Sequence, residues 1–189
     1  STAQRAELTA LVARLKQGEP LPYLTGRQEF FGLSFEVSPA VLIPRPETEL
    51  LVETALRWLR LHPAADSVLD VGTGSGCIAI SLAVHAPVLR VIATDLSAKA
   101  LSIAQRNAEV HHVEARITCV QADLIPKDLG RFDLICANLP YVPTSKLAEV
   151  NSLPFEPILA LDGGPDGLAL IKRCLAYAPA HIRAPGMLL

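Results

Sequence analysis

Residues 68–81 read VLDVGTGSGCIAIS, and the rest of the chain takes its meaning from its position relative to this stretch. The run VLDV is apolar and rich in β-branched residues, which predicts a strand buried on both faces. Gly72, Gly74 and Gly76 follow at alternate positions, and glycine accepts positive φ and lets a ligand approach the backbone. Apolar residues at helical spacing then predict a helix whose first amide groups point into the turn. The stretch therefore predicts a ligand-binding strand–turn–helix unit, with an ordinary tight turn as the alternative.

The spacing of these glycines distinguishes between cofactors. A dinucleotide fingerprint is G-x-G-x-x-G or A, and counting from Gly72 the last position is taken by Cys77. The pattern present is Asp-x-Gly-x-Gly-x-Gly. It looks like the nucleotide loop of the class I S-adenosylmethionine-dependent methyltransferases. The likeness implies that S-adenosylmethionine is held by Asp70 and by the turn itself, namely Gly72, Thr73, Gly74, Ser75 and Gly76.

The composition limits the classes of protein to which the chain can belong. It has 189 residues, 50% of them hydrophobic, which is enough for one domain with a substantial core and a small appendage. A net charge of −2 argues against general nucleic-acid binding. The four cysteines lie singly in apolar runs and the five histidines lack metal-ligand spacing, so we expect reduced thiols and no metal site. We expect a cytoplasmic monomer without a membrane segment.

The N-terminal third contains three predicted segments. Residues 2–17 predict an amphipathic helix, which needs a partner for its apolar stripe: either a larger helical domain or the main body. Residues 27–37 alternate around Gly32 and predict a hairpin. Residues 41–49, VLIPRPETE, predict an extended path in which Pro46 begins the next helix. For Arg45, Glu47 and Glu49 the alternative without a functional role is a solvated helix start, where acids are favoured by the helix macrodipole.

Acidic residues follow the next two predicted strands. Residues 90–94 form a buried strand that ends at Asp95, where a carboxylate and the adjacent Leu96 would lie against the ribose of an adenosine. The alternative is that Asp95 caps the helix predicted over residues 97–111. A third strand, residues 116–121, precedes Asp123 and Leu124. Asp123 could accept a hydrogen bond from the adenine amine while Leu124 packs on the ring, or it could be an ordinary loop aspartate.

The order of elements predicts the fold class. Strands and helices alternate, which indicates parallel crossovers and a doubly wound, Rossmann-like α/β sheet. A fourth predicted strand, residues 132–137, runs into Asn138, and a long loop is predicted over residues 142–166. A helix capped by Asp166 should then reach Tyr177, and a last strand should begin at Gly186. Ligands of such sheets bind at the carboxyl ends of the strands, where the glycine turn, both acids and Asn138 are expected.

The tetrapeptide at residues 138–141, Asn-Leu-Pro-Tyr, carries the predicted chemistry. A planar –NH₂ group is a poor nucleophile, and two acceptors directed at its hydrogens would orient it and favour positive charge on nitrogen. Asn138 can offer its side-chain oxygen and Leu139 can offer its backbone carbonyl as the two acceptors. Pro140 stiffens the turn, and Tyr141 can offer an aromatic face to the substrate or to a cationic sulfonium. The alternative is an ordinary turn after a strand.

With these residues in view, the chain resembles the HemK/PrmC family of protein glutamine methyltransferases. The resemblance covers most of the sequence and is most specific at IPRPETE and at EPILALDGGPDGL. It implies methylation of the glutamine in the Gly-Gly-Gln loop of class I peptide-chain release factors, or of a ribosomal-protein glutamine in one branch of the family. It also implies a helical-domain remnant at residues 1–26, a hairpin linker at 27–43 and a methyltransferase domain at 44–189. By its position in the motif, Asn138 is expected to contact both the substrate glutamine and the cofactor.

The chain departs from the family pattern in three places. Leu139 stands where the family usually has proline, and a leucine carbonyl can serve with less rigidity. Most of the helical domain and the C-terminal strands are expected to be missing, which would leave an open apolar sheet edge. Two alternatives therefore stay open: an adenine-amine methyltransferase acting on nucleic acid, and a catalytically impaired cofactor-binding fragment.

Overall fold

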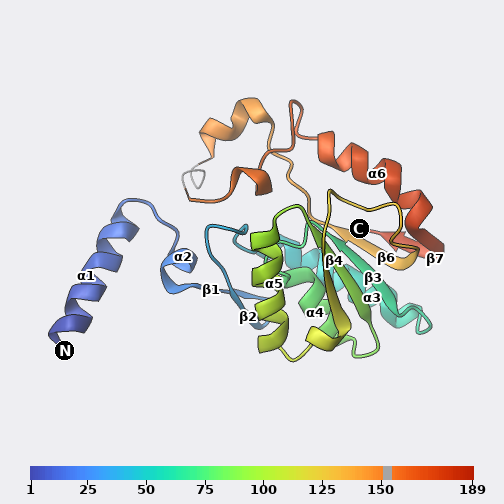
Figure 1. Cartoon of the computed structure of the whole chain (residues 1–189), viewed down its shortest axis with the longest axis horizontal. Coiled ribbons are helices and arrows are strands. Elements are labelled where there is room, and N and C mark those ends of the chain that lie inside the picture. The colour runs from blue at the N-terminus through green and yellow to red at the C-terminus, as the bar shows by residue number, and fades with distance from the viewer. Residues whose placement is uncertain (151–154) are drawn as a thin grey trace.

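The computed structural model describes residues 1–150 and 155–189, and its centre is a five-stranded sheet (Figure 1). All neighbouring strands of this sheet are parallel. In spatial order the strands are β5 (Ile117–Gln121), β4 (Arg90–Asp95), β3 (Ser67–Val71), β6 (Phe132–Ala137) and β7 (Ile182–Leu188). The order reverses on either side of β3, so the predicted doubly wound sheet is confirmed. Its switch point lies between the adjacent strands β3 and β6.

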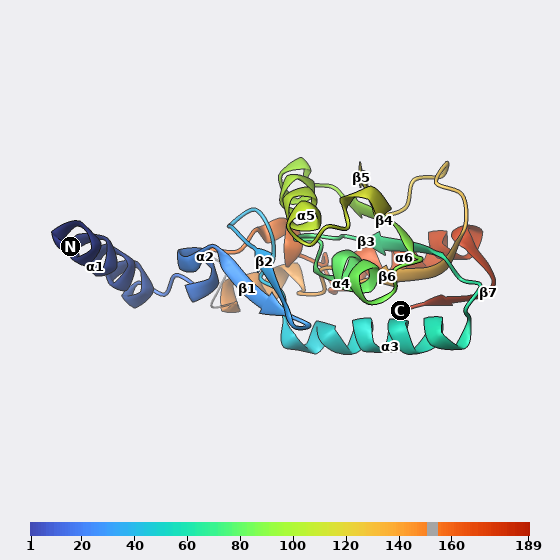
Figure 2. The same ribbon diagram turned by 90° about the horizontal axis from the view of Figure 1, so that it is seen from below.

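Helices cover both faces of the sheet and build two separate cores. On one face, α3 (Glu49–Leu61), α4 (Cys77–His85) and the inner residue Ala108 of α5 (Ala98–Val110) pack on apolar side chains of β3, β4 and β6. On the other face, α6 (Ala169–His181) packs through Cys174 and Ala178. Figure 2 shows α3 running along one side of the sheet. The central strands are buried on both faces, as their mostly apolar sequences predict.

The glycine turn joins β3 to α4 as predicted. All three of its glycines have positive φ: 72° at Gly72, 57° at Gly74 and 82° at Gly76. Helix α4 is buried from Cys77 to Ala83, because it lies between the sheet and its neighbouring helices. A Cβ atom at Gly76 would lie 2.9 Å from Ile80 Cδ1 and 3.1 Å from Ala104 Cβ. Gly76 therefore allows α4 and α5 to approach each other closely.

We expect Gly76→Ala to lower the free energy of unfolding by about 2–5 kcal/mol, the sum of a left-handed backbone and an overpacked core. Gly130→Ala is the matched control, since Gly130 also has a positive φ, of 77°, but has nothing within 4 Å of its Cβ position. The control should lose only the backbone share, about 1–2 kcal/mol. Urea unfolding of both variants measures the difference. Equal losses would show that close packing at Gly76 contributes nothing.

The N-terminal segments lie outside the sheet. Helix α1 (Thr2–Lys16) is followed by α2 (Leu21–Thr25) and by the predicted hairpin, β1 (Arg27–Phe30) and β2 (Leu33–Glu36). Both views show α1 projecting away from the main body (Figures 1 and 2). No residue of α1 is buried, and Leu8 is 62% exposed. The alternative that α1 packs on the main body is therefore wrong for this structure, and the division into domains stays a prediction.

Three predicted boundaries differ from the structure. Helix α6 begins at Ala169 rather than at Asp166, and it continues past Tyr177 to His181. Asp166 lies before the helix, where its Oδ1 atom accepts a hydrogen bond from the Leu168 amide at 2.9 Å. Strand β7 begins at Ile182, before the predicted start at Gly186, because its pairing with β6 includes Phe132 opposite Ile182. β7 forms one edge of the sheet and β5 the other.

The predicted long loop at residues 142–166 includes residues 151–154, which lie outside the described residues. Around them, the structure has short 3₁₀ turns: η3 (Thr144–Glu149) and η4 (Ile158–Ala160). Two further turns are η1 (Pro46–Thr48), where Pro46 begins the path into α3 as predicted, and η2 (Glu114–Arg116). In the described part of the chain, no helix has the length and apolar character that crossing a membrane requires.

Candidate functional site

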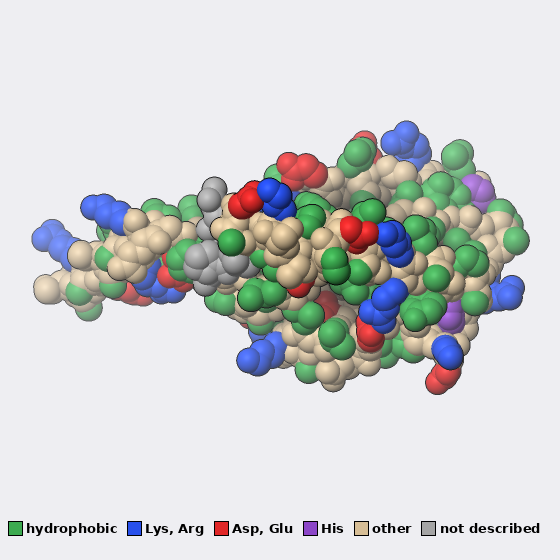
Figure 3. Space-filling model, turned by 90° about the horizontal axis from the view of Figure 1, so that it is seen from above, with side chains coloured by type: hydrophobic (Ala, Val, Ile, Leu, Met, Phe, Trp, Pro, Cys, Tyr) green, Lys and Arg blue, Asp and Glu red, His purple; other side chains and the backbone are tan. Residues whose placement is uncertain are grey.

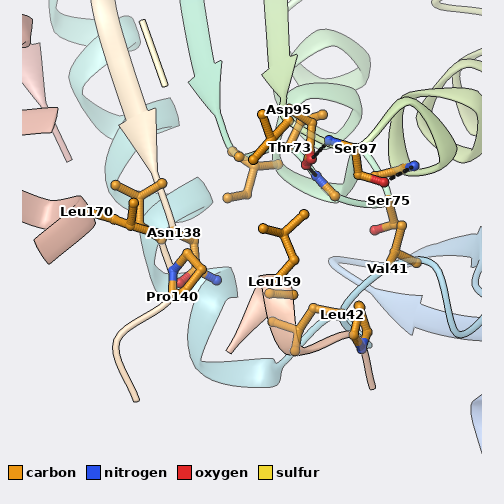
Figure 4. Close-up of a pocket in the computed structure, with 18 of the residues that line it drawn as sticks. Val41, Leu42, Thr73, Ser75, Asp95, Ser97, Asn138, Pro140, Leu159 and Leu170 are labelled. Carbon is orange, nitrogen blue, oxygen red and sulfur yellow. Dashed lines mark hydrogen bonds between the residues drawn. The ribbon is translucent and has the colours of Figure 1, made fainter. Parts of the chain in front are cut away.

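A cavity of about 270 Å³ lies at the carboxyl ends of β3, β4 and β6. Its volume is near the lower end of the range for small-molecule sites. Two further segments complete its wall: residues 40–48, which lead into α3, and residues 157–160. Figure 4 shows Thr73 and Asp95 on one side, Asn138 and Pro140 on another, and Leu159 between them. The predicted residues that line it are Gly72, Thr73, Gly74, Ser75, Asp95, Leu96, Asp123, Leu124, Asn138, Leu139 and Pro140.

The glycine turn presents bare backbone to this cavity. The amides of Gly72 and Thr73 donate to the Thr94 carbonyl at 2.8 and 2.9 Å, which holds the turn against β4. Gly74 lines the cavity, and a Cβ atom at this position would meet nothing within 4 Å. A ligand can therefore reach the backbone at Gly74 without meeting a side chain. Gly76 itself does not line the cavity; it faces α5 instead.

Asp95 connects the turn to the start of α5. Its Oδ2 atom accepts from the Gly74 amide at 2.9 Å, and its Oδ1 atom accepts from the Ser97 amide at 2.8 Å. The helix cap is the Ser97 hydroxyl, which accepts from the Ala100 amide at 3.2 Å. Each carboxylate oxygen has a further lone pair available for a ligand hydroxyl. The carboxylate is thus held in place at the cavity wall.

Asp123 and Leu124 occupy the next part of the wall, after β5. Leu124 is buried with φ of 60°, a left-handed conformation that places it among the apolar residues of the second core. Asp123 Oδ2 lies 2.7 Å from Arg173 Nη2, and both residues line the cavity. The sequence reasoning missed Arg173, because the 50 residues between the two carry no sign that α6 returns to this edge. The side chains are about half exposed, so this ion pair contributes little to stability.

Asn138 follows β6 and reaches the entry segment. Its Nδ2 atom donates to Thr48 Oγ1 at 3.0 Å, which leaves its Oδ1 atom available. Leu139 is buried, and a Cβ atom added at Gly72 would lie 3.2 Å from Leu139 Cδ2. The leucine that replaces the usual proline therefore packs against the glycine turn. Pro140 lines the cavity, as predicted.

Tyr141 is the part of the tetrapeptide that the structure does not bring to the cavity. Its side chain is 66% exposed and is absent from the cavity wall. Its neighbour Val142 pairs with the segment that follows η4: the Val142 amide donates to Leu161 at 3.0 Å, and Gly163 donates to Val142 at 2.8 Å. The predicted aromatic contact between Tyr141 and the substrate or the cofactor stays a prediction.

Asp70 lies beneath the glycine turn rather than on the cavity wall. It is fully buried, and its Oδ2 atom accepts from the Thr73 hydroxyl at 2.6 Å. Burial raises the pKa of Asp70 to about 6, the Thr73 hydroxyl acts in the opposite direction, and the charge of Asp95 adds to the rise. Its influence on a ligand is therefore indirect, through the position of Thr73 and through its charge.

We expect Asp70→Asn to gain stability relative to the wild type as the pH rises from about 4 to 6. An acid whose pKa is higher in the folded state binds a proton on folding, so its contribution to stability is lost as the pH rises through this window. A difference of about two pKa units corresponds to about 3 kcal/mol. Urea unfolding at several pH values measures it, with the exposed Asp128→Asn as control. A stability difference independent of pH would contradict this account.

The entry segment is joined to the segment before η4 by a buried glutamate. The Glu156 side chain is fully buried; its Oε2 atom lies 2.6 Å from Arg45 Nη2, and its Oε1 atom accepts from the Ile43 amide at 3.1 Å. The Phe31 amide donates to Glu49 Oε1 at 2.8 Å. Arg45 and Glu49 therefore make specific contacts that the alternative of a solvated helix start does not include. The two most specific motifs of the resemblance, around IPRPETE and EPILALDGG, form one wall of the cavity.

No group of three or more His, Cys, Asp or Glu side chains suitable for a metal ion is found among residues 1–150 and 155–189. The four cysteines are free, and Cys77 lines the cavity. Burial raises the pKa of the Cys77 thiol to about 12, with the nearby Asp70 charge as the second cause. Cys77 is therefore a neutral packing residue and not a nucleophile.

Comparison with known proteins gives matches over most of the chain. The family model for the methyltransferase small domain matches residues 46–151. The release factor glutamine methyltransferase of Geobacter sulfurreducens is 46% identical over 187 residues, 97% of this chain and 64% of that protein. The enzyme of the same name from Bordetella pertussis is 46% identical over 189 residues, 97% of this chain and 68% of that protein. The chain thus spans about two thirds of the length of these relatives.

Solved structures with the same fold are more distant in sequence. The hMettl16 catalytic domain in complex with a MAT2A 3′UTR hairpin has a TM-score of 0.63 at 20% identity, over 81% of this chain and 60% of that one. The N-terminal domain of human METTL16 in complex with SAH has a TM-score of 0.54 at 21% identity, over 81% of this chain and 59% of that one. At these identities the likeness concerns the fold alone, and it confirms the predicted Rossmann-like methyltransferase architecture.

Proposed function

The chain belongs to the family of release factor glutamine methyltransferases, and from this premise we propose that the protein methylates the side-chain amide nitrogen of a glutamine. The substrate we propose is the Gly-Gly-Gln loop of class I peptide-chain release factors, a role that would place the protein in the cytoplasm. The observation that carries the proposal is the Asn138 side chain, which lines the cavity with its nitrogen bonded to Thr48 and its oxygen available as an acceptor.

S-adenosylmethionine fits the cavity as the methyl donor, and when bound it supplies an electrophilic methyl group. Three features support this assignment. The backbone at Gly74 is open to a ligand. The Asp95 carboxylate at the end of β4 can accept hydrogen bonds from ribose hydroxyls. Leu124 offers an apolar surface for a planar ring and Asp123 an acceptor beside it.

The residues after β6 would act on the glutamine. The amide nitrogen is a weak nucleophile because its lone pair is delocalised into the carbonyl group. The Asn138 side-chain oxygen and the Leu139 carbonyl would accept its two hydrogens, hold the amide plane in one orientation and favour positive charge on nitrogen. No general base is required before transfer, because the proton can leave afterwards. Apolar side chains, among them Leu159, line the cavity.

The test uses full-length protein, S-adenosylmethionine and a purified class I release factor. We expect one added methyl group on the glutamine of the Gly-Gly-Gln loop, mapped by mass spectrometry of the peptide. A release factor with Gln→Ala in this loop should accept none. If the glutamine stays unmodified while the protein binds S-adenosylmethionine, the proposed substrate is wrong and the impaired-fragment alternative gains support.

The adenine-amine alternative is less well supported. Its chemistry is the same, since an adenine amine also offers two hydrogens to Asn138 and Leu139. Nucleic-acid binding, however, depends on basic groups that contact phosphates. The net charge is −2, and on the face drawn in Figure 3 acidic and basic side chains are interspersed. Transfer of labelled methyl to DNA or RNA in the same assay would favour this alternative. The monomeric state stays a prediction.

A further inference from the structure

The contact between Asn138 and Thr48 joins two segments that lie 90 residues apart in the chain. The amide nitrogen Nδ2 of Asn138 donates to Thr48 Oγ1 at 3.0 Å, and both residues line the cavity. Thr48 is 9% exposed, so water does not compete freely for its hydroxyl group. The hydrogen bond is therefore a partly buried contact at the reacting end of the site.

The two ends of the Asn138 amide are chemically different. The oxygen accepts hydrogen bonds, whereas the nitrogen only donates them. A substrate –NH₂ group presents two donors, so it can form a hydrogen bond with the oxygen end of the Asn138 amide. It cannot form one with the nitrogen end, because both groups would be donors. In the structure Nδ2 is bonded to Thr48 Oγ1, so the nitrogen end of the amide is held at Thr48 and the oxygen end is left for the substrate. An apolar or ammonium side chain at this position could not accept this hydrogen bond.

The surroundings of Thr48 hold its hydroxyl in one place. Threonine is branched at Cβ, which restricts its side-chain rotamers. The Thr48 amide donates to the Arg45 carbonyl at 3.0 Å within η1, and Arg45 in turn forms an ion pair with the fully buried Glu156 side chain at 2.6 Å. Thr48 thus lies at the junction of η1 and α3, in a segment fixed at both ends.

We propose that Thr48 is a positioning residue, which holds the Asn138 amide with its oxygen toward the –NH₂ group of the substrate. The inference rests on the proposed function and deepens it, because it assigns a specific task to the IPRPETE segment. Thr48 acts through Asn138 and does not itself contact the substrate nitrogen.

The test compares Thr48→Val, which keeps the shape and removes the hydroxyl, with Thr48→Ser, which keeps the hydroxyl. In full-length protein, Thr48→Val should lower kcat for release factor methylation about 10- to 30-fold, since each tenfold corresponds to about 1.4 kcal/mol. Affinity for S-adenosylmethionine, measured by calorimetry, should change less than about twofold, because the hydrogen bonds of Thr48 go to Asn138 and Arg45 and not to the glycine turn. Thr48→Ser should recover most of the activity. Thr118→Val, at an exposed position of β5, is the matched control.

A second readout is independent of activity. The side-chain amide resonances of Asn138 in an ¹⁵N-correlation spectrum should shift in Thr48→Val and return toward their wild-type positions in Thr48→Ser. The proposal is overturned if Thr48→Val has wild-type kcat, if its Asn138 resonances do not move, or if serine fails to restore what valine removes. A wild-type protein that methylates no glutamine would refute the proposed function instead, and the resonances would still report on the hydrogen bond.

Discussion

Asn138→Ala is expected to lower kcat for glutamine methylation by about 100- to 1,000-fold, the usual effect of removing one group that stabilises developing charge in a transition state. The variant loses the acceptor that would orient the substrate amide, and it leaves Thr48 without its donor at 3.0 Å. Affinity for S-adenosylmethionine should change much less, because the glycine turn and Asp95 are untouched. Single-turnover methylation with saturating release factor, beside calorimetry with S-adenosylmethionine, separates the two effects.

Asn138→Asp is the informative companion variant. A carboxylate keeps an acceptor toward the substrate, and the Thr48 hydroxyl can donate to its other oxygen. The aspartate variant should therefore retain more activity than the alanine variant. If Asn138→Ala remains within about threefold of the wild-type kcat, the side chain is not part of the methyl-transfer site, and the alternative of an ordinary turn after β6 is correct.

Asp95→Ala is expected to weaken S-adenosylmethionine binding by about 100- to 10,000-fold. Two hydrogen bonds from ribose hydroxyls to a carboxylate, each contributing about 1.5–3 kcal/mol, account for this loss. The substitution also releases the Gly74 and Ser97 amides that the carboxylate holds at 2.9 and 2.8 Å, so the turn loses its support. Calorimetric titration with S-adenosylmethionine measures the dissociation constant directly.

Two further variants make the Asp95 result specific. Asp95→Asn keeps one acceptor oxygen and should show an intermediate loss of affinity. Asp128→Ala removes an exposed carboxylate that does not line the cavity, so its affinity should match the wild type. A wild-type dissociation constant for Asp95→Ala would place the ribose elsewhere and would leave Asp95 as a structural contact between the glycine turn and α5.

Much of the site follows from the sequence for a simple geometric reason. Parallel strands joined by right-handed crossovers bring their carboxyl ends to one edge of the sheet, so residues that directly follow β3, β4 and β6 must meet there. Gly74, Asp95 and Asn138 were predicted on this ground, and the structure brings all three to one cavity. The buried strands, the hairpin and the helices α4 and α5 follow from local apolar patterns in the same way.

What the sequence by itself determined is therefore the fold class, the glycine turn and the order of residues along the sheet edge. Each of these depends on short-range pattern or on the topology of parallel crossovers. Only the tertiary structure decided which distant segments close the cavity: Thr48 on Asn138, Arg45 on Glu156 and Arg173 on Asp123, separated by 90, 111 and 50 residues. It also decided that Tyr141 faces solvent. Such contacts depend on how distant loops pack and on which side chains become buried against one another. No local pattern of residues encodes this packing.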